Sequence, residues 1–250
     1  MKKRMFLLLG ICFILALIVW SKKREWSYEE RTGPEYWGEL APSNATCAKG
    51  SEQSPINIET SQVIEDENII GKQINYEPTT FTLLNNGHTI QANATTENNS
   101  IVVEGIEYQL SQFHLHTPSE HQFNGQNYDV EIHFVHKDKS GKLAVLGVMI
   151  QEGRKNKVLA TLWDSLPKEE TKKAVSEKYL IHLPALLPKN QESFYYDGSL
   201  TTPPCTEDVQ WIVFENPIQM SKEQIKAFQE IFEHNHRPVQ PLNERDIIKN

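Results

Sequence analysis

The sequence predicts a mainly β, single-domain protein with one mostly antiparallel sheet and a few peripheral helices. Short segments that alternate between apolar and polar residues recur through the middle of the 250-residue chain, and this two-residue period is typical of half-buried strands. No internal repeat, low-complexity tract or interdomain linker interrupts residues 25–250. The 38% of hydrophobic residues suit a folded core, and β domains of this length are common.

Residues 1–24 are predicted to be a targeting segment. Lys2, Lys3 and Arg4 precede an apolar run from Met5 to Trp20, which is the pattern of a signal peptide. No clear A-x-A cleavage site follows, and the run is slightly shorter than the roughly 17–25 residues of a membrane span. A cleaved signal peptide and an uncleaved N-terminal membrane anchor therefore both stay open. Either one makes the domain exported, and so periplasmic, secreted or anchored on the outer side of the cell membrane.

The body of the chain is acidic. Residues 1–24 contain six basic residues and no acidic residue, so the formal net charge of −8 becomes −14 for residues 25–250. This charge argues against nucleic acid or an anionic membrane surface as a partner. A membrane contact is expected through the N-terminal segment alone, if that segment is not cleaved.

Cysteine usage agrees with export. Cys12 lies in the apolar run, which leaves Cys47 and Cys205 in the body. Two cysteines in an exported domain favour one disulfide, with a free reactive thiol as the alternative. A zinc site built on cysteines is not expected, because the sequence contains no Cys-x-x-Cys motif.

The elements follow in order along the body. A loop is expected at Ser43–Pro55. The expected strands are Thr80–Leu84, Thr89–Ala92, Ile101–Val103, Ile106–Leu110, Gln112–His116, Val130–His136 and Leu143–Ile150. A turn signal, Asn85–Gly87, separates the first two strands. The expected helices are Lys155–Leu166 and Ser221–Glu233, and the second begins with a capping-box pattern. The tail, Arg237–Asn250, is expected to be irregular.

Three histidines on these strands suggest a metal site. Residues two apart on a strand point to the same face, so His114 and His116 project side by side. The polar connection over residues 117–129 lets the next strand return beside them and add His133 to that face. Three imidazoles without a fourth protein ligand form the ligand set of a catalytic zinc. The open position holds a water whose pKa is about 7.

Polar neighbours strengthen this interpretation. Gln112 lies two residues before His114 and Glu131 lies two residues before His133, each on the same strand face as the histidine. Ligating histidines usually give their second ring N–H to such a group. A lone His-x-His on a strand is more often a solvated or hydrogen-bonded pair. With the third histidine and the two polar neighbours, the pattern supports a metal site as strongly as it supports a hydrogen-bonded pair.

Several separated motifs favour the metal site further. They are Gln53–Asn57, Leu84–His88, Gln112–His116, Ser119–His121, Glu131–His136, Leu143–Gly147, Gly198–Pro204, Trp211–Val213 and Asn235–Pro238. In these motifs and their order the chain resembles the α-class carbonic anhydrases, of the exported bacterial type, from about residue 25 to the C-terminus. The resemblance implies one catalytic domain over residues 25–250, with about ten strands in a twisted sheet and zinc at the bottom of a conical cleft.

The resemblance also implies the reaction, the reversible hydration of carbon dioxide to bicarbonate and a proton by attack of zinc hydroxide. The residues that match the zinc ligands are His114, His116 and His133. Those that match the groups orienting the ligands are Gln112, Glu131 and Asn235. Thr201 matches the threonine that accepts a hydrogen bond from zinc hydroxide, and Glu120 matches the carboxylate that takes the threonine's proton.

Further matches concern the substrate and the proton. The positions that match the carbon dioxide pocket and the bicarbonate site are Val135, Val145, Leu200, Val209, Trp211 and Thr202. An apolar pocket suits a small, neutral, nonpolar substrate. His88 matches the proton shuttle, for which an imidazole with a pKa near 6.5 is well suited. Residues that match the water-ordering positions are Tyr28, Asn86 and Gln91. Gln91 departs from the asparagine of several members, and Tyr36 competes with Tyr28 for its position.

Other matches are structural. His121 and His136 match histidines beneath the site that bind no metal, and Cys47 and Cys205 match the disulfide of exported members, which would brace the Thr201 loop. The expected partner is the small-molecule substrate, and a homodimer is left open. Two other classes remain: a non-catalytic binding module on this fold, and a zinc esterase or hydrolase. The ligands, Thr201 and Glu120 disfavour the first, and the lack of a His-Glu-x-x-His motif disfavours a peptidase-type hydrolase.

Overall fold

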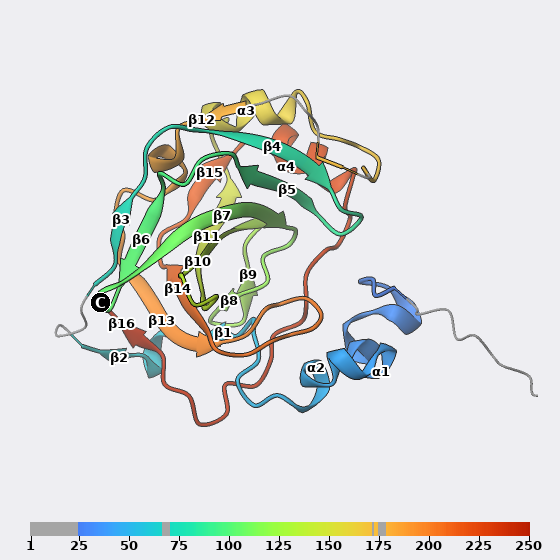
Figure 1. Cartoon of the computed structure of the whole chain (residues 1–250), viewed down its shortest axis with the longest axis vertical. Coiled ribbons are helices and arrows are strands. Elements are labelled where there is room, and N and C mark those ends of the chain that lie inside the picture. Colours follow the sequence, from blue (N-terminus) through green and yellow to red (C-terminus); the bar gives the residue numbers. More distant parts are fainter. Residues whose placement is uncertain (1–24, 67–70, 172, 175–178) are drawn as a thin grey trace, which may run out of the picture.

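A computed structural model describes residues 25–66, 71–171, 173–174 and 179–250 (Figure 1). The predicted signal peptide or anchor, residues 1–24, lies outside this range. Within the described part of the chain, no helix is long and apolar enough to cross a membrane.

The chain forms many short strands and few helices. The strands are β1 (Asn57–Ile58), β2 (Ile64–Glu65), β3 (Gln73–Asn75), β4 (Thr79–Asn85), β5 (Ile90–Ala94), β6 (Ser100–Val103), β7 (Ile106–His116), β8 (Gln122–Phe123), β9 (Gln126–Asn127), β10 (Val130–Lys137), β11 (Leu143–Glu152), β12 (Tyr179–Ile181), β13 (Ser193–Gly198), β14 (Val209–Phe214), β15 (Ile218–Met220) and β16 (Ile248–Lys249). The α-helices are α1 (Trp37–Leu40), α2 (Thr46–Lys49), α3 (Lys157–Trp163) and α4 (Lys222–Gln229). The 3-10 helices are η1 (Glu30–Thr32), η2 (Pro34–Tyr36), η3 (Pro42–Asn44), η4 (Thr60–Gln62) and η5 (Leu183–Leu186).

One large curved sheet of 13 strands organises the described residues. Its main path is β12-β4-β5-β7-β10-β11-β14-β13-β16-β2, with β3, β6 and β15 attached beside it. Most neighbours are antiparallel, whereas β14 and β15 pair with β11, and β2 pairs with β16, in parallel. A small second sheet has the order β1-β8-β9. The predicted fold class, mainly β with a mostly antiparallel sheet of about ten strands, is therefore confirmed.

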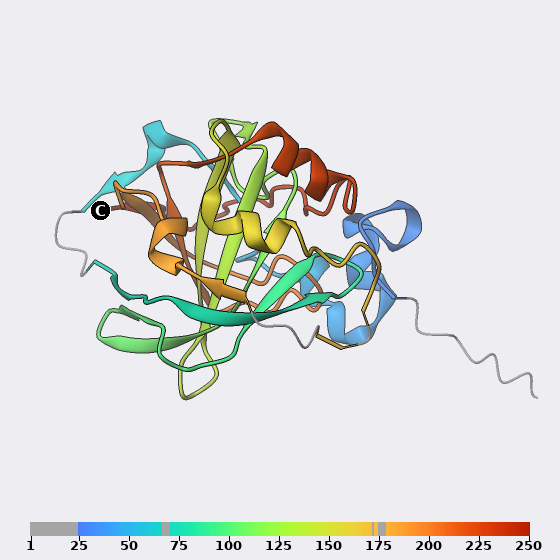
Figure 2. The same ribbon diagram turned by 90° about the horizontal axis from the view of Figure 1, so that it is seen from above.

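The helices lie around the sheet. In Figures 1 and 2, α3 and α4 lie along one side of the sheet, and α1 and α2 (blue) lie at another. The middle of Figure 1 is occupied by β7, β10 and β11. The strands that carry the three histidines are thus central strands with a neighbour on each side.

The predicted break between Ile106–Leu110 and Gln112–His116 is wrong, because β7 is continuous. Gln112 pairs with Val135 and Leu110 pairs with His136, so the register of β7 against β10 shifts at this point. The extra residue, Ser111, forms a β-bulge. A bulge interrupts the alternation of side chains without ending the strand, which is why the sequence pattern suggests two strands.

Both predicted helices exist but are shorter. Helix α3 begins after Asn156, whose side chain accepts hydrogen bonds from two backbone N–H groups of the first turn. Helix α4 begins after Ser221, and the predicted capping box with Gln224 is present. Two segments that were predicted to be irregular contain regular structure. The expected loop at Ser43–Pro55 contains the single helical turn α2, and the expected irregular tail contains strand β16.

The apolar face of the central strands fixes the position of the polar face. Phe113 and Leu115 of β7 and Ile132 and Phe134 of β10 are almost completely buried in the main hydrophobic cluster. Burying each such side chain stabilises the fold by about 1.5–3 kcal/mol. Because successive strand residues face opposite sides, these four anchors place the intervening histidines on the other face.

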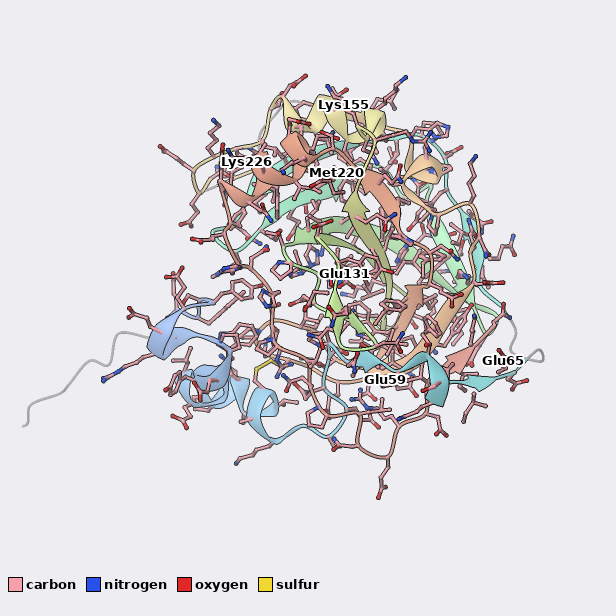
Figure 3. The ribbon with its side chains drawn as sticks, turned by 180° about the vertical axis from the view of Figure 1, so that it is seen from behind. Glu59, Glu65, Glu131, Lys155, Met220 and Lys226 are labelled. Atoms are coloured by element: carbon pink, nitrogen blue, oxygen red, sulfur yellow. A yellow bond between two sulfur atoms is a disulfide. The ribbon has the colours of Figure 1, made fainter. Side chains whose placement is uncertain are left out.

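A disulfide joins two distant parts of the chain. Cys47 in α2 is bonded to Cys205, 158 residues later in the loop after β13, as predicted. The yellow sulfur–sulfur bond lies beside the N-terminal helices in Figure 3. The buried Arg237 side chain reinforces this junction, donating to Cys47 O at 2.9 Å, to Ser54 O at 2.8 Å and to Gln53 Oε1 at 2.9 Å. Closing so long a loop is worth about 4–5 kcal/mol in the chain-entropy model.

Candidate metal centre and cavity

The three predicted histidines converge on one face of the sheet. His133 of β10 lies directly opposite His114 of β7 in the antiparallel register, and His116 lies two residues further along β7. The ring centroids are 5.0 Å apart for His114 and His116, 5.3 Å for His114 and His133, and 4.6 Å for His116 and His133. Ring nitrogens of all three lie within 4.8 Å of one another, close enough to share one metal ion.

Each imidazole is oriented by a hydrogen bond from one of its nitrogens. His114 Nδ1 donates to Gln112 Oε1 at 2.9 Å, and His133 Nε2 donates to Glu131 Oε1 at 2.9 Å. His116 Nδ1 donates to the backbone oxygen of Asn235 at 2.6 Å. These three acceptors are the ones predicted. The remaining nitrogens are His114 Nε2, His116 Nε2 and His133 Nδ1.

These free nitrogens fit a zinc ion. His116 Nε2 is completely buried and has no hydrogen-bond partner among the described residues, which is unusual for a buried polar atom. Burial lowers the pKa of all three imidazoles, to about 4 for His116 and well below the usual value for His114. The histidines are therefore neutral at pH 7, as ligation requires. A set of neutral imidazoles with oriented rings suits zinc.

Glu131 organises the floor of the site. Its Oε1 accepts from His133 and from His121 Nδ1 at 2.7 Å, and its Oε2 accepts from the backbone N–H groups of Glu120 and His121, both at 2.9 Å. Burial alone would raise the pKa of Glu131, but His121 and His133 keep it well below its usual range. Figure 3 shows Glu131 in the interior of the molecule, among the central strands.

His121 and His136 have structural contacts, in agreement with the prediction. His121 donates from Nδ1 to Glu131, and its Nε2 is hydrogen-bonded to the Tyr196 hydroxyl at 2.6 Å, so neither ring nitrogen is free for the second acid–histidine group, His121, Glu131 and His133. His136 pairs Nε2 with the Tyr76 hydroxyl at 2.6 Å, away from the three converging histidines.

Glu120 lies beneath the metal centre. Its Oε1 accepts from the backbone N–H of Arg237 at 2.8 Å, while Oε2 lies 3.4 Å from His116 Nε2 and 3.8 Å from His133 Nδ1. No described group forms a hydrogen bond of normal geometry with this buried Oε2. Burial raises the pKa of Glu120 to about 7, although His133 and the Thr201 hydroxyl act in the opposite direction.

A cavity of about 150 Å³ opens above the histidines. Its lining residues are Trp26, Tyr28, Asn86, His88, Thr89, Gln91, Gln112, His114, His116, His133, Val135, Val145, Leu200, Thr201, Thr202 and Trp211. The predicted substrate residues therefore meet there, except Val209, which packs in the same apolar cluster but does not line the cavity. A larger cavity of about 310 Å³, bordered by β6, β13 and β14, contains none of the three histidines.

His88 lines the 150 Å³ cavity together with the three histidines. The Asn86 side chain accepts from the backbone N–H groups of His88 and Thr89, both at 2.9 Å, which forms the turn. Asn235 Nδ2 donates to His88 O at 3.0 Å. The imidazole stacks on Trp26, with centroids 3.6 Å apart and planes 13° apart. Burial lowers the pKa of His88, whereas Glu170 and Glu25 act to raise it.

The sequence reasoning missed Trp26 and Thr89 as cavity residues. Trp26 carries a usable signal, since it lies two residues before Tyr28 in an aromatic-rich segment. Tyr28 lines the cavity, while its competitor Tyr36 is exposed. Burial raises the pKa of Tyr28 well above its usual value. Gln91 also reaches the cavity and donates from Nε2 to Asn93 Oδ1 at 2.6 Å.

Comparisons with known proteins agree with this geometry. The family model described as eukaryotic-type carbonic anhydrase matches residues 32–250. A carbonic anhydrase of Nostoc sp. is 40% identical over 232 residues, which cover 92% of this chain and 87% of the relative. The α-carbonic anhydrase of Thermovibrio ammonificans, solved with sulfanilamide, has a TM-score of 0.84 and 40% identity, covering 90% of this chain and 98% of the other. Dioscorin DB3L of Dioscorea polystachya is 34% identical, covering 98% of this chain and 93% of the relative.

Proposed function

The chain belongs to the eukaryotic-type, or α-class, carbonic anhydrases and is an enzyme that reversibly hydrates carbon dioxide, and we propose that it does so with a zinc ion at His114, His116 and His133. One observation carries this proposal. Two buried imidazoles and one half-buried imidazole have ring nitrogens within 4.8 Å of one another, while the other nitrogen of each ring donates to a carbonyl or carboxylate oxygen. A group of histidines that only packed together would not need this division of its nitrogens.

Three protein ligands would leave a bound zinc ion one open position for solvent. When bound, zinc supplies a Lewis acid that lowers the pKa of a coordinated water to about 7. Gln112, Glu131 and Asn235 fix the tautomer and the direction of the three rings, so that the ligating nitrogens are aligned before metal arrives. Ring alignment of this kind raises metal affinity because little side-chain freedom remains to be lost.

Thr201 and Glu120 orient the nucleophilic oxygen. In its ionised form, Glu120 accepts a hydrogen bond from the Thr201 hydroxyl, so the Thr201 oxygen is left to accept a hydrogen bond from the nucleophile. Glu120 cannot turn away, because Arg237 N donates to its Oε1 at 2.8 Å. A lone pair of the nucleophile is thereby aimed at the substrate carbon, which is a contribution of positioning.

The opposite wall receives the substrate. Val135, Val145, Leu200 and Trp211 form an apolar surface beside the histidines, which suits a small molecule without charge or dipole. Thr202 adds a hydroxyl near the product, and Val209 supports this wall from behind. A cavity of about 150 Å³ has room for carbon dioxide and bicarbonate.

Each hydration also releases a proton, for which His88 is the proposed acceptor. His88 and the three proposed ligands line the same cavity, and so do Tyr28, Asn86 and Gln91. These last three side chains carry polar atoms that can order water there. His88 is half-buried and borders solvent, so it can pass the proton to buffer.

We also propose that residues 25–250 are the catalytic domain and that residues 1–24 direct export, as a signal peptide or as a membrane anchor. Two observations support this: the basic and apolar pattern of the segment and the disulfide Cys47–Cys205, since such bonds form in oxidising compartments. The acidic body and the small cavity support a small-molecule substrate and disfavour nucleic acid.

Metal analysis combined with a hydration assay tests the proposed function. The purified protein is expected to contain one zinc per chain and to hydrate carbon dioxide. Esterase activity should be weaker and should depend on the same metal. A protein without zinc, or one whose hydration activity survives complete metal removal, would contradict the proposal. Zinc without hydration activity would support a binding module instead.

His88→Ala is expected to lower the maximal hydration rate about tenfold. This is less than the roughly 10²–10⁴-fold effect of an acid–base group in the chemical step, since buffer replaces the lost acceptor. Exchange of isotope between carbon dioxide and bicarbonate, which needs no net proton transfer, should be nearly unchanged. Imidazole buffer should restore turnover, and His234→Ala, at an exposed histidine, is the control. Equal losses in exchange and turnover would exclude His88 as the shuttle.

A further inference from the structure

The segment Pro167–Thr171 is attached to the base of the His88 turn. Thr171 N donates to Asn85 O at 2.9 Å, and Asn85 N donates to Thr171 Oγ1 at 3.2 Å. Asn85 Nδ2 also donates to Pro167 O at 2.9 Å. Asn85 is buried and ends β4, immediately before the turn. Residues 167–171 therefore hold a fixed position against the turn that carries His88.

This attachment brings one carboxylate to the turn. Glu170 is exposed to solvent, but its Cδ and Oε2 lie 3.5 Å from the position that a Cβ atom would occupy on Gly87. Gly87 has a φ of +84° and precedes His88 directly. A carboxylate thus fills the space beside the residue that adjoins the imidazole, and it comes from a segment more than 80 positions away in sequence.

We propose that Glu170 is a positioning residue for proton exchange: its carboxylate, held against the His88 turn by the Pro167–Thr171 segment, stabilises the protonated imidazole. The proposal rests on the proposed role of His88 as the shuttle. Glu170 does not touch the substrate or the metal ligands, and it acts through the charge of His88.

The charges around His88 agree with this arrangement. Burial disfavours the imidazolium and lowers the pKa of His88, and Glu170, followed by Glu25, acts against that effect. In the part of the chain that the structure describes, the titratable groups that face His88 are Glu170 from the 167–171 segment, and Glu25 and Tyr28 from the N-terminal segment. From the C-terminal segment, the uncharged Asn235 contacts its backbone. Of the two carboxylates that raise the pKa of His88 against the effect of burial, Glu170 has the larger effect.

The sign of the effect follows from the direction of proton flow. In Glu170→Gln the imidazolium loses a nearby negative charge, so the pKa of His88 should fall. Uptake of a proton during hydration then becomes less favourable and slower, while release of a proton during dehydration becomes easier. A purely structural role for Glu170 would slow both directions alike.

The experiment compares Glu170→Gln with Glu169→Gln, which removes the same charge from the neighbouring exposed residue. The pKa of His88 is measured from its ring proton signals by NMR, at low salt and at 1 M salt. Maximal hydration and dehydration rates are measured on the zinc enzyme. Glu170→Gln is expected to lower the pKa of His88 and to slow hydration about two- to threefold, the scale of an exposed charge pair. Glu169→Gln should leave both values unchanged, and Glu170→Asp should restore them in part.

Salt provides an independent check. An exposed charge is screened within about 3 Å at 1 M ionic strength, so the difference between Glu170→Gln and the unaltered enzyme should disappear there. Equal His88 pKa values in the two glutamine variants at low salt would overturn the proposal, as would a shift that left hydration unchanged. Retention of full turnover by His88→Ala would instead refute the shuttle itself, and this outcome is recognised separately because the NMR shift in Glu170→Gln would persist.

Discussion

His133→Ala is expected to abolish zinc binding and carbon dioxide hydration together. His133 is one of the three proposed ligands, and its ring centroid lies 5.3 Å from that of His114 and 4.6 Å from that of His116. The two imidazoles on β7 alone would not hold a zinc ion firmly, because catalytic zinc sites have three protein ligands. Because a metal supplies several kcal/mol of transition-state stabilisation, its loss should reduce the hydration rate by about 10³-fold or more.

Metal content and hydration rate are to be measured on the same samples. The control is His136→Gln, on the same strand but paired with the Tyr76 hydroxyl at 2.6 Å. It removes a buried imidazole without touching the metal centre, so it should lose stability but keep zinc and activity. Circular dichroism separates loss of metal from loss of fold. Full hydration activity in metal-free His133→Ala would refute the mechanism.

Glu131→Ala is expected to have the second largest effect, on zinc affinity and on stability together. Glu131 is completely buried and accepts four hydrogen bonds, from two imidazoles and two backbone N–H groups. Loss of such an orienting partner typically weakens metal binding about 10- to 100-fold. Leaving buried donors without a partner should also cost about 3–5 kcal/mol of unfolding free energy.

The comparison variant is Gln112→Ala, which removes a single orienting bond, that to His114 at 2.9 Å. It should weaken zinc binding with little loss of stability, because Gln112 is half-buried. Zinc affinity is to be measured against a competing chelator, and stability by urea unfolding of the metal-free protein. Equal losses of stability in Glu131→Ala and Gln112→Ala would refute the hypothesis that the four hydrogen bonds of Glu131 stabilise the fold.

The stability supplied by Glu131 should depend on pH in a defined direction. The pKa of Glu131 in the folded protein is well below the ordinary value of 4.5. Such a group contributes its full stability above pH 4.5 and loses it as the pH falls toward the folded pKa. The difference in unfolding free energy between the unaltered metal-free protein and Glu131→Ala should therefore be constant near neutrality and shrink below pH 4.5.

The three histidines could be proposed as metal ligands from local pattern, although that pattern alone left a hydrogen-bonded cluster as an equal alternative. A two-residue period places His114 and His116 on one face, and the same rule finds Gln112 and Glu131 beside their histidines. Asn235 could not be found in this way. Its backbone oxygen reaches His116 across 119 positions of sequence, and any residue type has a backbone oxygen, so its role came from the resemblance.

Other parts of the structure that the sequence did not predict also depend on long-range contacts. Several strands are short or pair with partners that are distant in sequence, so no local alternation of apolar and polar residues predicts them clearly. These strands are β2, β13, β14, β15 and β16. The contact of Trp26 with His88 joins the N-terminal segment to the β4–β5 turn, and the sequence of neither segment indicates that the two are in contact. Ser111 shows the opposite case, in which a bulge imitates a strand end.

The central position of β7 and β10 has a kinetic consequence. Strands at the margin of a sheet can detach by local opening, whereas central strands are released only in the highest-energy openings. With β5 on one side and β11 on the other, the ligand-bearing backbone is shielded from fraying at both margins of the sheet. The geometry that selects the metal is therefore as long-lived as the native state itself. Slow inactivation under denaturing conditions should follow the global unfolding rate and not local opening of the active site.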